Sequence, residues 1–314
     1  MILCLPVRAH RHATEKGFAM SKISRRLFLA GTGAVMGAGL LTRPAIAGPS
    51  NIYYVNGVAV RRYLPINSNN RPPVILLHGG AHAGWAWDRY ATYFASQGWT
   101  CHALDWYNHG LSSALPLTTF LTRSIKDILT EINLVRATLP NPNRFILMGH
   151  SMGAMAALYA SQTLRPRALV MTAPVVPAEV GAMAIEIAID FTQPFPVPPF
   201  EIAKAMFYST MSDAEAMQYY VQLTPESPQA VWEATRWTIP VNLASVMAPT
   251  KIAVGAADTL TPPSVVQPLA TMMGAQYTLW PGIGHSDLML KESGWAPVAQ
   301  DIQQWLCGCT SPTQ

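Results

Sequence analysis

A serine flanked by small residues stands between two apolar segments of this sequence. The pentapeptide 149–153 reads GHSMG; the apolar run 145–148 precedes it and an alanine-rich run follows. A serine held at a sharp strand-to-helix turn needs small residues two positions away on each side. The N–H groups of the following helix point at developing negative charge. The pattern predicts Ser151 as a nucleophile, and an ordinary glycine turn is the alternative.

An acid and a histidine follow two further apolar runs. Asp258 comes just after the run 252–255, and His285 comes just after the run 276–280. In an open α/β sheet, ligands bind outside the carboxyl ends of the strands. We therefore expect both side chains to lie near Ser151, in a pattern that could activate a hydroxyl group.

A glycine-rich loop, LLHGGAHAGWAW at residues 76–87, follows the first buried run. Glycines there allow backbone N–H groups to approach a substrate oxygen closely. Gly80 and Met152 are predicted to supply the two N–H donors that hold an oxyanion. The loss of one such donor costs about 10²–10³-fold in turnover.

Strand-like and helix-like segments alternate along the chain, which predicts βαβ units on a mostly parallel central sheet with helices on both faces. Asn56-Gly57 between two β-rich runs predicts a hairpin that adds an antiparallel edge. The predicted strands are 74–77, 100–106, 145–148, 168–172, 252–255 and 276–280, and the predicted helices are 87–96, 120–139, 154–164, 264–273 and 296–306.

Residues 175–247 interrupt this alternation. The segment has a proline-rich turn around 194–199 and helical stretches rich in Met, Phe, Tyr and Trp. Long insertions of this kind usually serve a site, so we interpret it as a helical lid inserted between core segments 48–174 and 248–314. The alternative is an ordinary helical stretch packed on the sheet.

The first 47 residues have the features of an export signal. Paired arginines at 25–26 precede a 16-residue apolar run, Arg43, and an A-x-A site at 45–47, as in twin-arginine signals. We expect the export machinery to recognise this leader, with Met20 as the preferred start, and the mature chain to be periplasmic or secreted. An uncleaved anchor is the alternative, but the run is shorter than the roughly 20 residues that span a bilayer.

Without that leader, the remaining 267 residues carry 14 basic and 16 acidic side chains, and no basic patch suggests nucleic acid or anionic lipid as a partner. We expect a small-molecule substrate and no stable membrane insertion. No histidine and cysteine spacing matches a zinc site, so no metal is predicted. A bridge between Cys307 and Cys309 would be strained, which favours unpaired thiols.

These motifs together resemble the α/β-hydrolase superfamily from about residue 52 to 306. The segment 78–87 is similar to the plant hydroxynitrile lyase and methylesterase branch, and DWYNHGLS at 105–112 resembles a loop of general bacterial members, with Tyr107-Asn108 as a departure. The resemblance implies an α/β-hydrolase fold and an order of nucleophile, acid and base along the chain. It implies Ser151 as nucleophile, His285 as general base and then acid, and Asp258 as the orienting carboxylate.

The expected activity is hydrolysis of a carboxylic ester or related acyl bond of a largely apolar molecule, without a cofactor. Alternatives that keep the same three residues are a C–C bond-cleaving lyase or a cofactor-free haloperoxidase, and a non-catalytic binding protein is a third. The weaker candidates for site residues are Asp105 or Asp287 as the acid, His82 as a pocket residue, and His78, His109 and His150 as structural histidines.

Overall fold

The computed structural model describes residues 48–67 and 70–310. The predicted leader, residues 1–47, lies outside the described residues. No helix in the described part of the chain is long and apolar enough to cross a membrane.

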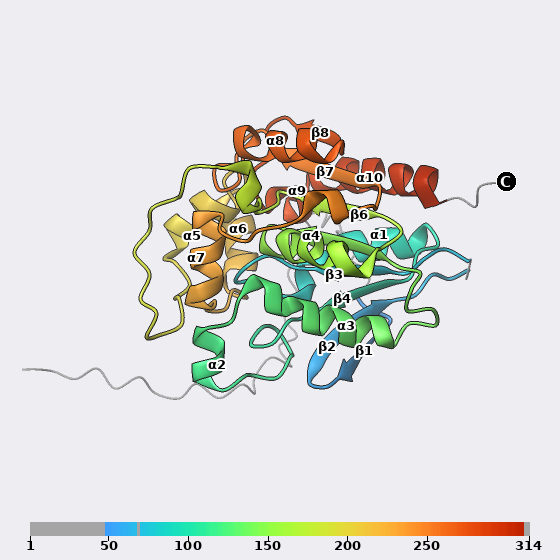
Figure 1. The fold of residues 1–314 in the computed structure, drawn as a ribbon, viewed down its shortest axis with the longest axis horizontal. Helices are drawn as coiled ribbons and strands as arrows, with labels where there is room; N and C mark the ends of the chain where they lie inside the picture. The colour runs from blue at the N-terminus through green and yellow to red at the C-terminus, as the bar shows by residue number, and fades with distance from the viewer. Residues whose placement is uncertain (1–47, 68–69, 311–314) are drawn as a thin grey trace, which may run out of the picture. The chain divides into compact units, whose positions relative to one another are not determined.

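A single eight-stranded sheet organises the described chain, in the spatial order β1-β2-β4-β3-β5-β6-β7-β8 (Figure 1). The hairpin of β1 and β2 is antiparallel and pairs antiparallel with β4, whereas the other neighbours are parallel. This confirms the predicted mostly parallel sheet with an antiparallel edge. The strands are β1 (Asn51–Val55), β2 (Val58–Tyr63), β3 (Val74–Leu77), β4 (Cys101–Leu104), β5 (Ile146–His150), β6 (Leu169–Thr172), β7 (Thr250–Gly255) and β8 (Gln276–Trp280).

The central strands are apolar on both sides because helices cover both faces of the sheet. Alternate residues of β3 enter different cores: Ile75 and Leu77 pack in one cluster, and Val74 and Leu76 pack in the other. Helices α3 (Leu129–Ala137), α4 (Met152–Leu164) and α8 (Pro263–Met273) contribute to the first cluster. Helices α1 (Asp88–Ser96), α9 (Asp287–Leu290) and α10 (Trp295–Thr310) contribute to the second.

One predicted helix is divided in the structure. The apolar spacing over 120–139 suggests one continuous helix, but the chain forms α2 (Leu117–Leu121), the 3-10 turn η2 (Ile125–Ile128) and then α3. A capping box at Ser124 explains the break, because its hydroxyl accepts from the N–H of Lys126 and its own N–H donates to Asp127. The apolar residues still face the core, since Ile125, Ile128 and Ile132 are buried.

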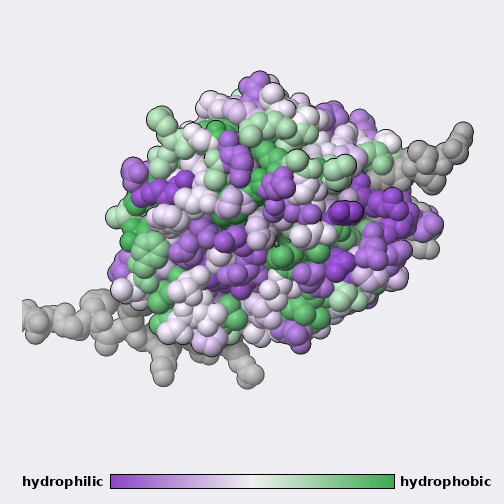
Figure 2. Space-filling view, viewed as in Figure 1, coloured by the Kyte–Doolittle hydropathy of each residue, from purple (hydrophilic) through white to green (hydrophobic). Residues whose placement is uncertain are grey.

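The predicted lid segment, residues 175–247, lies between β6 and β7 and carries α5 (Phe200–Phe207), α6 (Asp213–Tyr220) and α7 (Pro228–Arg236), at the left of Figure 1. Short 3-10 turns lie outside these helices at η1 (Gly84–Trp87), η3 (Ala178–Val180) and η4 (Leu243–Ser245). Hydrophobic residues reach the surface at that edge in Figure 2, and the lid residues Met183 and Val221 are largely exposed.

Candidate active site

Ser151 sits in a strained turn between β5 and α4. Its backbone angles are φ 54° and ψ −120°, a region that residues other than glycine rarely occupy. The turn is possible because its neighbours are small: a Cβ at Gly149 would collide with the carbonyl of Gly153, and one at Gly153 would collide with the carbonyl of His78. The sequence pattern therefore forms the sharp turn that it predicts.

Asp258 and His285 meet in the loops that follow β7 and β8. The Nδ1 atom of His285 lies 2.8 Å from Oδ2 of Asp258, and both residues are buried. The carboxylate also accepts from the N–H groups of Leu260 and Thr261, and from the Thr261 hydroxyl at 2.8 Å. Because a carboxylate only accepts, this bond places the imidazole proton on Nδ1 and leaves Nε2 as the acceptor.

The Nε2 atom of His285 is buried and has no hydrogen-bond partner within the described residues. The ring lies next to the turn that holds Ser151, because its centroid is 4.7 Å from that of His150. The described residues show no hydrogen bond between Ser151 and His285. Catalytic hydrogen bonds are often long before substrate binds. The arrangement leaves one imidazole nitrogen available for a proton near the serine.

The two residues predicted to supply the oxyanion donors lie side by side. A Cβ built on Gly80 would come within 2.7 Å of the Met152 sulfur, and one on Gly79 would be 3.2 Å from the Cβ of Ser151. Met152 is the first residue of α4, where backbone N–H groups have no partner in the helix. Gly80, Ser151 and Met152 all line one cavity.

This cavity has a core wall and a lid wall. The core wall carries Ser151 and the glycine-rich loop, and the lid wall is mostly apolar. Of the aromatic and Met residues in the lid, Phe195, Met206, Phe207 and Trp237 line the cavity, whereas Met183 and Phe191 are exposed. The lid residues that line it are Val175, Ile185, Ile187, Phe195, Pro196, Pro198, Met206, Phe207, Thr224, Glu226, Val231, Ala234, Thr235 and Trp237.

The other buried histidines near the site have partners on both ring nitrogens. His82 contacts the Gly80 carbonyl at 2.8 Å and the Tyr208 hydroxyl at 2.9 Å. His78 contacts the Gly79 carbonyl and accepts from the backbone N–H of Trp106. Burial lowers the pKa of His82 to about 4 and holds that of His78 well below its usual range. Both histidines therefore stabilise the conformation of the glycine-rich loop.

His150 is also satisfied, because its ring contacts the Thr172 carbonyl at 3.2 Å and the Ser286 hydroxyl at 3.3 Å. The rival acids have structural contacts as well. Asp105 accepts from the N–H groups of Gly84 and Leu111, which orders two loops. Asp287 accepts from the backbone N–H and hydroxyl of Thr210 in the lid and from the N–H of Gly284. Neither carboxylate is bonded to His285 in the described structure.

Two residues of the site were not predicted from the sequence. Thr261 supplies the hydroxyl that supports Asp258, and a threonine close to a predicted acid was an available signal. Glu226 lies in the lid wall and bonds to His109, 117 positions away in the chain. No spacing in the sequence marks that pair, because only the folding of the lid over the core brings the two side chains together.

A family model described as the alpha/beta hydrolase family matches residues 74–301, which is more than half of the chain. The chain belongs to the alpha/beta hydrolase family. The match spans every element that positions Ser151, Asp258 and His285, and it agrees with the fold predicted from the sequence. Among the described residues of this hydrolase, no three His, Cys, Asp or Glu side chains group together as a candidate metal site.

Similar proteins include methylesterase 3 and methylesterase 2 of Arabidopsis thaliana, at 28% identity over 93 residues and 29% over 92 residues. These matches cover 28% and 27% of the hydrolase, and about a third (32%) of each methylesterase. The similarity to plant methylesterases agrees with the resemblance seen in the glycine-rich loop.

Solved structures share the fold at lower identity. A thermophilic esterase from Thermogutta terrifontis has a TM-score of 0.63 at 16% identity, with 83% of this hydrolase and 100% of the esterase covered. The monoacylglycerol lipase of Paleococcus ferrophilus has a TM-score of 0.58 at 17% identity, with coverages of 82% and 99%. Together with the methylesterases, these neighbours support ester hydrolysis as the general activity of the family members that this chain resembles.

Proposed function

We propose that this hydrolase cleaves a carboxylic ester of a largely apolar small molecule through an acyl-enzyme on Ser151. The observation that carries the proposal is the His285 imidazole, bonded to Asp258 through Nδ1 and unpartnered at Nε2 beside the Ser151 turn. A serine becomes a strong nucleophile when an imidazole nitrogen accepts its proton and a carboxylate orients that imidazole.

In the first half of the proposed reaction, Nε2 of His285 takes the Ser151 proton as Oγ attacks the ester carbonyl carbon. The N–H groups of Gly80 and Met152 stabilise the negative oxygen of the tetrahedral intermediate. The carbon–oxygen bond to the alcohol then breaks, and His285 returns the proton to the leaving oxygen. Asp258 keeps the ring in the tautomer with its proton on Nδ1.

In the second half, water attacks the acyl-serine and gives its proton to the same Nε2 atom. The Ser151 ester bond breaks, the acid product forms, and the proton returns to Oγ. The apolar lid wall supports the proposed substrate class, because apolar cavity walls favour apolar substrate groups and exclude water from the reacting atoms.

A fluorophosphonate probe and p-nitrophenyl esters test this proposal. The wild-type protein is expected to form a covalent adduct at Ser151 and to show a burst of p-nitrophenol, as an accumulating acyl-enzyme requires. Ser151→Ala should lose both while keeping its circular dichroism spectrum. Equal turnover by Ser151→Ala would exclude the mechanism, and adduct formation without ester turnover would favour a lyase or haloperoxidase activity.

We also propose that the hydrolase is exported through the twin-arginine pathway. The paired arginines, the 16-residue apolar run and the A-x-A site of residues 1–47 support this proposal. Cell fractionation of the full chain should place esterase activity outside the cytoplasm. Replacing both Arg25 and Arg26 with Lys should retain it in the cytoplasm, and an unchanged distribution would contradict the proposal.

A further inference from the structure

Glu226 precedes α7 and is the only charged side chain among the described residues that line the cavity. It is buried, at 5% exposure, and its Oε2 atom would lie 3.5 Å from a Cβ built on Gly80. A buried carboxylate next to the proposed oxyanion donors would oppose negative charge there. Its neighbours therefore decide whether it harms or supports the reaction.

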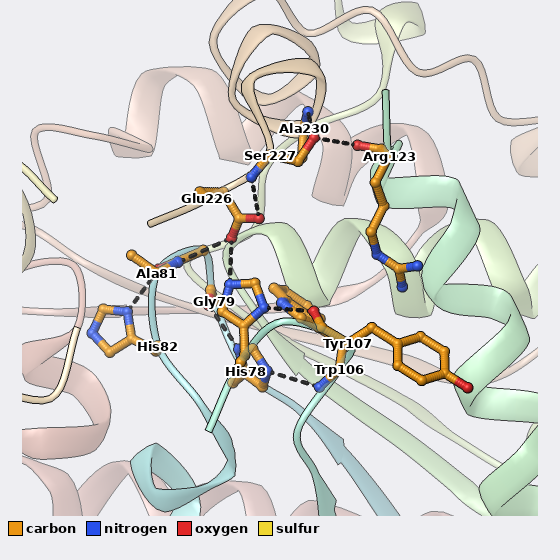
Figure 3. Close-up of polar contacts among 12 residues, drawn as sticks. His78, Gly79, Ala81, His82, Trp106, Tyr107, Arg123, Glu226, Ser227 and Ala230 are labelled. Atoms are coloured by element: carbon orange, nitrogen blue, oxygen red, sulfur yellow. Dashed lines mark hydrogen bonds and ion pairs between the residues drawn. The ribbon is translucent and has the colours of Figure 1, made fainter. Parts of the chain in front are cut away.

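Three donors surround the carboxylate. Its Oε2 atom accepts from the backbone N–H of Ala81 at 3.1 Å and lies 3.0 Å from Nε2 of His109, and its Oε1 atom accepts from the N–H of Ser227 at 2.8 Å. Figure 3 shows Glu226 between Ala81 and Ser227. The Ala81 carbonyl accepts from the N–H of Thr224 in the same lid segment, so the lid holds both backbone groups of Ala81.

His109 faces oxygen acceptors with both ring nitrogens. Nδ1 lies 3.0 Å from the Tyr107 carbonyl, and Nε2 faces the Glu226 carboxylate. A ring that donates to both of these acceptors carries a proton on each nitrogen, as an imidazolium does. Burial alone would raise the pKa of Glu226, but His109 and the N–H groups of Ser227 and Ala81 outweigh it and lower the pKa. Nε2 of His109 and Oε2 of Glu226 lie 3.0 Å apart and both side chains are buried, so an imidazolium there would pair with the carboxylate and leave no net charge.

We infer that His109 is an imidazolium, because both of its nitrogens face oxygen acceptors, and that the His109–Glu226 ion pair positions the oxyanion loop, an inference that rests on the proposed ester hydrolysis. Ala81 has φ 62°, in the left-handed region that a residue with a Cβ occupies at a cost. The carboxylate holds the Ala81 N–H, and so fixes the peptide that joins it to Gly80. Glu226 and His109 are positioning residues: the carboxylate sets the loop, and the imidazolium cancels the charge of the carboxylate.

The charge of His109 has a measurable consequence. Without the charge of His109, the unpaired Glu226 carboxylate would lie against Ala81, the neighbour of the proposed Gly80 donor. The negative oxygen of the intermediate develops at that donor. At an effective dielectric constant of about 20, an unpaired negative charge this close to the developing oxyanion lowers the rate by roughly 10–100-fold. Removing both charges leaves the pair neutral again, so the effects of the two substitutions on kcat should not be additive.

The test uses p-nitrophenyl acetate with the variants His109→Gln, Glu226→Gln and the double variant. His109→Gln should lower kcat about 30-fold and Glu226→Gln about 10-fold, with KM within about threefold of wild type. The double variant should be about three times as active as His109→Gln, because it removes the unpaired anion.

Glu233→Gln is the matched control. Glu233 is an equally buried lid glutamate, but it accepts from the Ser124 hydroxyl and the Ile125 N–H, away from the oxyanion loop. Its variant should keep kcat within about twofold while losing a similar amount of stability. Thermal unfolding of all four variants separates folding defects from positioning defects.

Three outcomes would overturn the inference: an unchanged kcat in His109→Gln, a double variant that loses activity additively, or equal kcat in Glu226→Gln and Glu233→Gln. If His109→Gln does not fold, the kcat values of Glu226→Gln and Glu233→Gln still test whether Glu226 positions the oxyanion loop. Failure of the wild-type protein to react with the fluorophosphonate probe would instead reject the proposed function, so the two failures are distinguishable.

Discussion

The core wall of the cavity carries Ser151 and backbone N–H groups held by short loops after parallel strands, whereas the lid wall is mostly apolar side chains around one carboxylate. The polar groups of the core wall are fixed by the sheet, because each follows a strand within a few residues. The lid wall depends in addition on contacts between segments far apart in the sequence, such as those of Glu226 with Ala81 and His109. The comparison separates the groups proposed to do chemistry from those that select the substrate and hold the loop.

The largest expected effect lies in the core wall. Asp258→Asn should lower kcat by about 10⁴-fold, because an amide cannot enforce the tautomer in which Nε2 of His285 accepts a proton. Steady-state kinetics with p-nitrophenyl acetate measure this loss. Asp287→Asn is the matched control, since that buried carboxylate binds Thr210 and Gly284 instead. A larger loss in Asp287→Asn would reverse the assignment of the acid.

A change in the lid wall should affect substrate choice rather than chemistry. Ile187 lines the cavity, and Ile187→Asp places a charge against the apolar part of the substrate. We expect kcat/KM for p-nitrophenyl octanoate to fall about 100-fold, mainly through KM, with little change for the acetate. Ala184→Asp, at an exposed position of the same segment, should have no such effect. Equal losses with both esters would mean that the two walls are not separable.

The smallest expected effect concerns the sheet, away from both walls. His102 in β4 bonds to Tyr53, and burial lowers its pKa to about 4. Between pH 6.5 and pH 4 the unfolded chain binds a proton that the folded chain does not, so stability falls as pH falls. This histidine should remove about 2 kcal/mol from the free energy of unfolding between pH 7 and pH 5. Urea titrations of His102→Gln should show a shallower pH dependence, and an identical slope would contradict the shift.

Much of the core wall could be predicted because its signals are local. Each signal indicates a strand and the turn after it: the small residues around Ser151, the apolar run before Asp258 and the apolar run before His285. The break at Ser124 was missed because apolar spacing continues through it, and the capping box decides the backbone instead. Glu226 was missed because its partners, Ala81 and His109, lie far away in sequence. Pairing of that kind depends on tertiary packing.

The lid holds Ala81 through both of its backbone groups, with Glu226 accepting from the N–H and Thr224 donating to the carbonyl. A swing of the lid away from the sheet would break these bonds together, and the peptide beside Gly80 would lose its anchor. Admission of a substrate and assembly of the anion-binding machinery would then be one event. With a molecule too large for the lid to close over it, Ser151 would be present, but the peptide beside the Gly80 donor would not be held in place.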